Sequence, residues 1–251
     1  MDLLIAEETR GVRAWHNDNG KLSELSLDLK LPPGVWSALI PGDMDNDGAL
    51  DYGLMNLAGE SGILKNDGAG RFEWLALPVS SQWAPVRGAH WLDADGDGRQ
   101  DLFVVQNLPA STWPAPPQAG GVGQAFRGMP GGGFQAWEPR ESGFIVQGAS
   151  TGCVLTDLNN DHAPDFLIAR NDQPMLALER SPSSSRWLTI RFHGPHRNVM
   201  ALGTRVAVDW NGRLKLLTEL YGGSGYLTQT ANRVFFPRPS SDGRGMIKVW
   251  W

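Results

Sequence analysis

The chain has 251 residues, with 31 Gly, 17 Pro and 11 Trp, and its formal charge is −5. This composition favours many short strands joined by turns over long helices. The chain contains no run of 18 apolar residues, which would predict a membrane span. It also contains no cluster of Lys and Arg, which would predict a nucleic-acid partner. The single cysteine, Cys153, excludes an internal disulfide, and we expect it to be a buried, unreactive thiol in a strand.

The first residues have the pattern of the later part of a repeat. Asp2 is followed by a strand-like apolar run at 3–6, and residues 14–22 have the pattern of a β-hairpin with Asn and Gly at its turn. The same order, an Asp, a strand and a hairpin, recurs further along the chain. We therefore expect further repeats upstream of Met1.

Three acidic loops organise the first 180 residues. The first loop is Asp43–Asp51, the second loop is Asp93–Asp101 and the third loop is Asp157–Asp165. The first two have Asp at positions 1, 3, 5 and 9 and Gly at position 6. The third loop differs, because Asn159 occupies position 3 and His162 occupies position 6.

This spacing suits Ca²⁺, which takes about six to eight oxygen ligands in a loose geometry. A chain that curls around an ion directs alternate side chains towards it, Gly at position 6 permits the turn, and position 7 offers its backbone carbonyl. The predicted ligands are Asp43, Asp45, Asp47, Ala49 and Asp51; Asp93, Asp95, Asp97, Arg99 and Asp101; and Asp157, Asn159, Asp161, Ala163 and Asp165. The alternative is a set of metal-free turns, which Asp, Asn and Gly also favour. Four clustered carboxylates repel one another without a cation, and this favours the metal at the first two loops.

The residues around the loops distinguish them from EF-hands. An EF-hand has a bidentate Glu at position 12 and flanking helices, whereas position 12 is Leu54, Val104 or Ile168. Apolar, strand-like runs precede and follow each loop, so we predict that each loop joins two strands. The loops begin at 43, 93 and 157, and a Pro- and Gly-rich insertion at 107–123 accounts for the longer interval. Repeats of about 45–50 residues with short strands are typical of β-propeller blades.

The acidic loops, each with a following strand and with an Asn-Asp-Gly hairpin at 66–68, resemble FG-GAP/VCBS repeats. These are the blades of integrin-α-like propellers. The resemblance covers residues 1–180 and implies an all-β fold with a partial β-propeller of about three and a half blades. It also implies a Ca²⁺ ion in each loop and a secreted, cell-surface or periplasmic location. The usual ring of seven blades would require missing blades or a second chain.

The remaining residues have a different pattern. Residues 181–185 are expected to be a polar linker, and alternating residues at 186–192 and 203–210 predict strands of a small β-sandwich or barrel over 186–251. Segments of this region resemble the ASPIC/UnbV domain, which follows FG-GAP repeats in cartilage acidic protein and in bacterial relatives. These segments are 186–190, 198–206, 222–229 and 247–251. The resemblance implies architecture more than activity.

Motifs for catalysis are weak. The run at 222–226 lacks the second glycine of a nucleophile elbow, and His193 and His196 lack a third metal ligand. Trp83 and Trp113 are the only candidates for ligand stacking. We therefore expect a calcium-binding module for adhesion to an unknown protein or glycan. The alternatives are a non-catalytic part of a polysaccharide lyase or hydrolase, and a purely structural scaffold.

Overall fold

The computed structural model describes residues 3–78, 84–107, 121–171, 173–181, 186–210, 212, 215–223, 228–239 and 244–251. Within these ranges the fold is almost entirely β, with six antiparallel sheets and one four-residue helix, α1 (Pro139–Ser142). The predicted all-β class is therefore confirmed. No helix among these residues is long and apolar enough to cross a membrane. Asp2, Trp83 and Trp113, most of the predicted linker and most of the insertion lie outside the described residues.

The described part of residues 3–178 forms four sheets, and each is a meander of strands that are consecutive in the chain. The first sheet contains β1 (Leu3–Glu7), β2 (Gly11–Asp18) and β3 (Lys21–Leu25). The second contains β4 (Trp36–Gly42), β5 (Asp51–Asn56), β6 (Gly62–Asn66) and β7 (Phe72–Ala76). The third contains β8 (Val86–Leu92), β9 (Asp101–Gln106), β10 (Gln124–Gly128) and β11 (Phe134–Trp137). The fourth contains β12 (Ser150–Thr156), β13 (Asp165–Arg170) and β14 (Leu176–Leu178).

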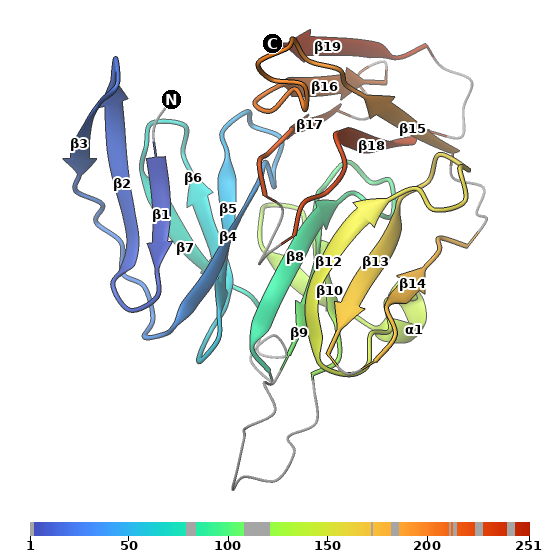
Figure 1. Cartoon of the computed structure of the whole chain (residues 1–251), viewed down its shortest axis with the longest axis horizontal. Coiled ribbons are helices and arrows are strands. Elements are labelled where there is room, and N and C mark those ends of the chain that lie inside the picture. Colours follow the sequence, from blue (N-terminus) through green and yellow to red (C-terminus); the bar gives the residue numbers. More distant parts are fainter. Residues whose placement is uncertain are drawn as a thin grey trace, which may run out of the picture.

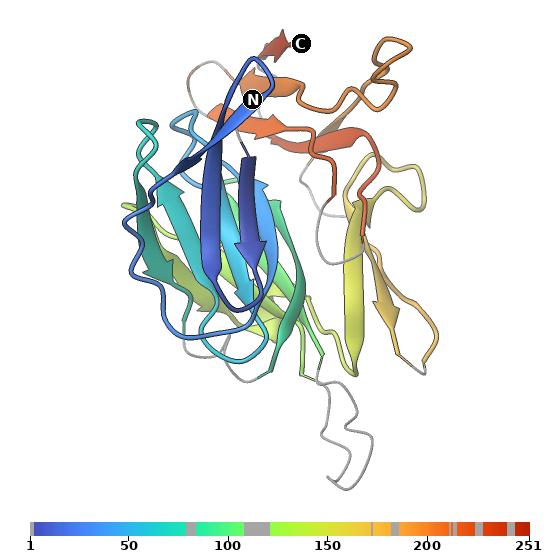
Figure 2. The same ribbon diagram turned by 60° about the vertical axis from the view of Figure 1, so that its left-hand side comes forward.

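These four sheets stand side by side in an arc, in chain order, as propeller blades do (Figures 1 and 2). The first strands of neighbouring sheets are in contact, β4 with β8 and β8 with β12. Side chains reach across these contacts to backbone carbonyls: Ser37 Oγ donates to Val86 O at 3.0 Å, and Trp91 Nε1 donates to Ile40 O at 3.1 Å. The strands at the centre of the arc are thus linked directly as well as through packing.

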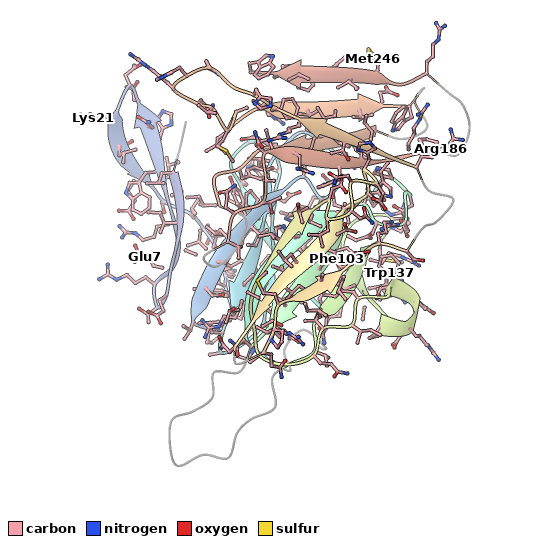
Figure 3. The ribbon with its side chains drawn as sticks, turned by 45° about the vertical axis from the view of Figure 1, so that its right-hand side comes forward. Glu7, Lys21, Phe103, Trp137, Arg186 and Met246 are labelled. Atoms are coloured by element: carbon pink, nitrogen blue, oxygen red, sulfur yellow. The ribbon has the colours of Figure 1, made fainter. Side chains whose placement is uncertain are left out.

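The middle sheets bury both faces, which explains their continuous apolar runs. In β9, Leu102 and Val104 pack in one core cluster, while Phe103 and Val105 pack in another. Successive side chains of a strand point to opposite faces, so this strand serves the cores on both sides of its sheet. Phe103, labelled in Figure 3, lies 5.2 Å from Phe144 and 5.0 Å from Phe166 between ring centroids.

The C-terminal strands form two further sheets around a core of their own. β15 (Arg186–Arg191) pairs with β18 (Arg233–Arg238), and β16 (Arg205–Asp209) lies between β17 (Lys215–Glu219) and β19 (Met246–Trp250). Val206, Val208, Leu216 and Phe236 are buried in their shared core. This is the small β-domain expected from the alternating sequence. Figure 1 shows it lying across one end of the arc.

His90, on β8, provides a test of the contact between the third and fourth sheets. Its ring is buried, and its Nε2 lies 2.7 Å from Cys153 O of β12. Burial lowers the pKa of His90 from 6.5 to about 4. The unfolded chain therefore binds more protons than the folded chain between these values, and stability is lost as the pH falls through this window.

We expect the His90 contribution to the free energy of unfolding to fall by about 2 kcal/mol between pH 7 and pH 5. His90→Gln keeps an N–H donor and does not titrate, so its denaturant unfolding should lack this part of the pH dependence. Identical pH profiles for the two proteins would contradict the neutral, buried state of His90.

Candidate metal sites in three acidic loops

Each acidic loop connects the first and second strands of its sheet, as the sequence predicts. The strand registers place Gly42 opposite Asp51, Leu92 opposite Asp101 and Thr156 opposite Asp165. The Asp at position 9 is therefore the first residue of the second strand. A rigid antiparallel pair thus holds both ends of every loop.

The same hydrogen bonds fix the first and last carboxylates in all three loops. In the first loop, Asp43 accepts from the N–H groups of Asp47 at 3.1 Å and Gly48 at 3.0 Å. Asp51 accepts from Met44 N and from Asn66 N, both at 2.8 Å. The equivalent donors to position 9 are Ala94 and Gly128 in the second loop, and Leu158 and Arg180 in the third. Position 9 therefore ties the loop to the third strand of the sheet or to the residues just after it.

The loop backbone takes positive φ at two positions. Position 6 does so at Gly48 (95°), Gly98 (91°) and His162 (72°), as the glycine pattern predicts. Position 4 does so as well, at Asn46 (58°), Gly96 (77°) and Asn160 (61°), and sequence reasoning missed this. The signal was present, because Asn and Gly are the residues that tolerate this conformation best.

The first two loops gather carboxylates into clusters that could hold a metal ion. Oxygens of Asp43, Asp45 and Asp47 all lie within 4.8 Å of one another, as do those of Asp93, Asp95 and Asp101. Ligands at about 2.3–2.6 Å from one Ca²⁺ ion lie at most about 5 Å apart, so this spacing fits. The other two predicted carboxylates, Asp51 and Asp97, are not members of these clusters.

The third loop has a different arrangement. Its acidic residues form no such cluster among the described residues, and the Asn159 amide donates to Asp161 Oδ2 at 3.1 Å. His162 adopts positive φ, which is strained for a residue with a side chain. Roles for the Ala49, Arg99 and Ala163 carbonyls stay predictions.

Burial makes the clustered charges costly. Asp43, Asp51, Asp93 and Asp101 are buried. Loss of water contact, partly offset by the backbone donors, raises the pKa of Asp43, Asp93 and Asp101 to about 7 and that of Asp51 to about 6. Repulsion from neighbouring carboxylates is a smaller contribution to these raised pKa values. A bound cation would favour the ionised forms of all four groups.

Basic side chains, most of them from other segments, already face these carboxylates. Lys65 Nζ lies 2.8 Å from Asp45 Oδ2 in the first loop, and Arg127 Nε lies 3.0 Å from Asp95 Oδ2 in the second. Arg99 pairs with Asp97, and Arg233 NH1 lies 3.9 Å from Asp157 in the third loop. Sequence reasoning assigned the neutralising charge to a metal alone. The structure supplies part of this charge from the protein itself.

The C-terminal domain contacts all three loops. Leu217 N donates to Asn46 Oδ1 at 3.0 Å, and Arg205 donates to Gly48 O. Thr189 Oγ1 donates to His162 O at 2.6 Å, and a Cβ at Gly96 would lie 3.6 Å from Pro237 Cβ. The first two loops also meet, since Asn46 Nδ2 donates to Gly98 O at 2.7 Å. The loops are therefore an interdomain contact as well as candidate metal sites.

A pocket of about 120 Å³ lies at this junction, lined by residues of both parts of the chain. Its walls include Asp43 and His90 below, and Glu219, Tyr221 and Arg233 from the C-terminal domain. The buried Tyr221 hydroxyl has no hydrogen-bond partner among the described residues. The pocket is small compared with the roughly 300–1,000 Å³ of typical ligand sites.

Comparison with known families agrees with this geometry. Residues 43–104 match the FG-GAP-like repeat family. The matched range runs from the first residue of the first loop to the strand after the second loop, so it contains both carboxylate clusters. A search of curated proteins finds no match to the chain.

The strained position in the third loop leads to a stability prediction. We expect His162→Gly to raise the free energy of unfolding of the metal-free protein by about 0.5–1 kcal/mol, because glycine adopts positive φ without the side-chain penalty. The matched change Gly48→Ala should lower it by about 1 kcal/mol. A Cβ added at position 48 would contact only Arg205 and Leu217, at 3.9 and 4.0 Å, and would not collide with them. The change in the free energy of unfolding would therefore report the backbone strain of positive φ. Urea unfolding in chelator measures both, and a destabilised His162→Gly would contradict the strain.

Proposed function

We propose that the protein is a calcium-binding module of the FG-GAP kind that acts outside the cytoplasm in binding or adhesion. The observation that carries the proposal is the pair of carboxylate clusters, which lie at equivalent places in two blades within the matched repeat. FG-GAP repeats are often extracellular, and this supports a secreted or cell-surface location.

The donor chemistry favours Ca²⁺ over softer metals. The first two loops offer carboxylate and carbonyl oxygens and contain no His or Cys, and oxygen-only sets suit hard cations. In the first loop Asp43, Asp45 and Asp47 would hold the ion, and in the second Asp93, Asp95 and Asp101. Asp51 and Asp97 would complete these sets, and the third loop would bind more weakly through Asp157, Asn159, Asp161 and Asp165.

The bound ion would have a structural role. It would neutralise buried carboxylates and tie the two strands of a blade to the loop between them. Because the loops also contact β15, β16 and β17, it would stiffen the surface on which the C-terminal domain rests. No reaction step is required of it.

Recognition of a ligand would then depend on the surfaces of the arc and the C-terminal domain. We propose a protein or glycan ligand, with a second chain or further blades completing the propeller. For residues 186–251 we propose an ASPIC/UnbV-like domain, because they form a small two-sheet β-domain directly after the blades.

Chelation tests the proposed function. We expect excess EDTA to lower the melting temperature by about 5 °C or more. A ligand that binds only the folded state, at a free concentration of about 100 times its Kd, stabilises that state by about 2.7 kcal/mol, and EDTA would remove this stabilisation. Asp43→Asn combined with Asp93→Asn should abolish most of this response. An unchanged melt in EDTA, with no metal detected by elemental analysis, would contradict the proposal.

The loop–domain contact can be tested at one atom. We expect Asn46→Gly to speed hydrogen exchange of the Leu217 amide about tenfold, because the variant keeps the positive φ but removes the acceptor of that N–H. Asn160→Gly, at the same position of the third loop, should leave this amide unchanged. Equal exchange rates of Leu217 in all three proteins, measured by NMR, would contradict the contact.

A further inference from the structure

The first two loops have the same pattern of acids but face different numbers of basic groups. The first loop has one ion pair to a carboxylate, between Lys65 and Asp45. The other nearby cation, Arg205, donates to the backbone carbonyl of Gly48 and pairs with Glu219. In the described part of the chain, the carboxylates of the first loop thus have a single basic partner.

Arginines surround the second loop. Arg127 pairs with Asp95, and Arg99 pairs with Asp97. Arg180 donates to Ala94 O at 2.6 Å, and its charge acts on Asp93, Asp101 and Asp95. Three guanidinium groups thus lie near this loop, and two of them pair with its carboxylates.

Lys65 and Arg127 occupy equivalent places in their blades. Each immediately precedes the residue whose N–H binds the Asp at position 9, namely Asn66 in one blade and Gly128 in the other. Each also pairs with the Asp at position 3. In the fourth sheet this place belongs to Glu179, before Arg180, and position 3 is Asn159. A basic residue therefore occupies this place where position 3 is an Asp, and an acidic residue occupies it where position 3 is the uncharged Asn159.

A basic group paired with a carboxylate opposes the binding of a cation to that carboxylate. It lies within 3.0 Å of an oxygen that the ion would use, and its positive charge repels the ion. The pairs are partly exposed, with 23–40% of each side chain accessible, so solvent and salt reduce the repulsion without abolishing it.

We propose that these basic side chains compete with the divalent cation, so that the first loop, facing one lysine, binds it more tightly than the second loop, facing three arginines. The inference rests on the proposed function, since it assumes that the loops bind Ca²⁺. Arg127 is the arginine to test, because it pairs with a carboxylate of the cluster itself, as Lys65 does in the first loop. The additional positive charge at the second loop comes from Arg99 and Arg180.

Calcium titration calorimetry on the full chain tests the competition. The Kd of the second loop for Ca²⁺ is measured in a variant in which Asp47→Asn and Asp161→Asn weaken binding by the other two loops. The Kd of the first loop is measured in a variant that carries Asp97→Asn and Asp161→Asn. We expect the Kd of the second loop to exceed that of the first about tenfold, Arg127→Met to lower the second-loop Kd about tenfold, and Lys65→Met to lower the first-loop Kd about threefold.

Two controls separate charge from packing. Arg127 also stacks on Trp137, with its guanidinium 4.3 Å from the ring centroid, so Arg127→Lys, which keeps the charge, should retain the high Kd. Arg13→Met removes an arginine paired with Glu7 and Glu24 in the first sheet and should change neither constant.

The outcomes are distinct. A raised or unchanged second-loop Kd in Arg127→Met would overturn the competition, since it would mean that Arg127 positions Asp95 or does nothing to the ion. A Kd in Arg127→Lys equal to that in Arg127→Met would overturn it as well. Absence of calcium binding to the wild type and to every variant would instead refute the proposed function.

Discussion

The structure depends on carboxylates that are buried next to one another at the ends of three loops. Three of the four blades pass from their first strand to their second through a nine-residue loop whose backbone N–H groups would otherwise lack partners. The Asp residues at positions 1 and 9 accept those bonds, and position 9 also accepts an N–H from the third strand or the residues just after it. The cost is several negative charges in a small, partly dry volume. Counter-charge is therefore required, either from protons, from basic side chains or from a metal ion.

This constraint links the blades to the domain above them. The same loops that carry the charges also touch one another and the C-terminal sheets, through Asn46, Gly48 and His162. A change in the charge state of a loop therefore acts directly on an interdomain contact. With Ca²⁺ bound as proposed, the loops would hold the C-terminal sheets in a fixed relation to the blades.

Local features of the fold could be predicted from sequence. The three loops, the strands on either side and the positive φ at position 6 followed from spacing and residue type, because Asp51 and Gly48 act on residues close to them in the chain. The separate C-terminal β-domain followed from its alternating residues. The FG-GAP match then agreed with the first two loops.

Long-range partners could not be predicted. The Arg127–Asp95 pair and the Leu217–Asn46 bond join residues 32 and 171 positions apart, and a single sequence does not reveal which surfaces meet. The strain at His162 was also hidden, since its φ is imposed by the loop and not preferred by the residue. Clustered carboxylates therefore indicated a need for positive charge without showing how much of it the protein supplies.

Anomalous diffraction from crystals grown with calcium would show whether the loops hold the ion. We expect an anomalous peak within about 2.6 Å of oxygens of Asp43, Asp45 and Asp47, with a weaker peak among Asp93, Asp95 and Asp101. Ordinary water density at both places, with the Lys65–Asp45 and Arg127–Asp95 pairs intact, would contradict this expectation.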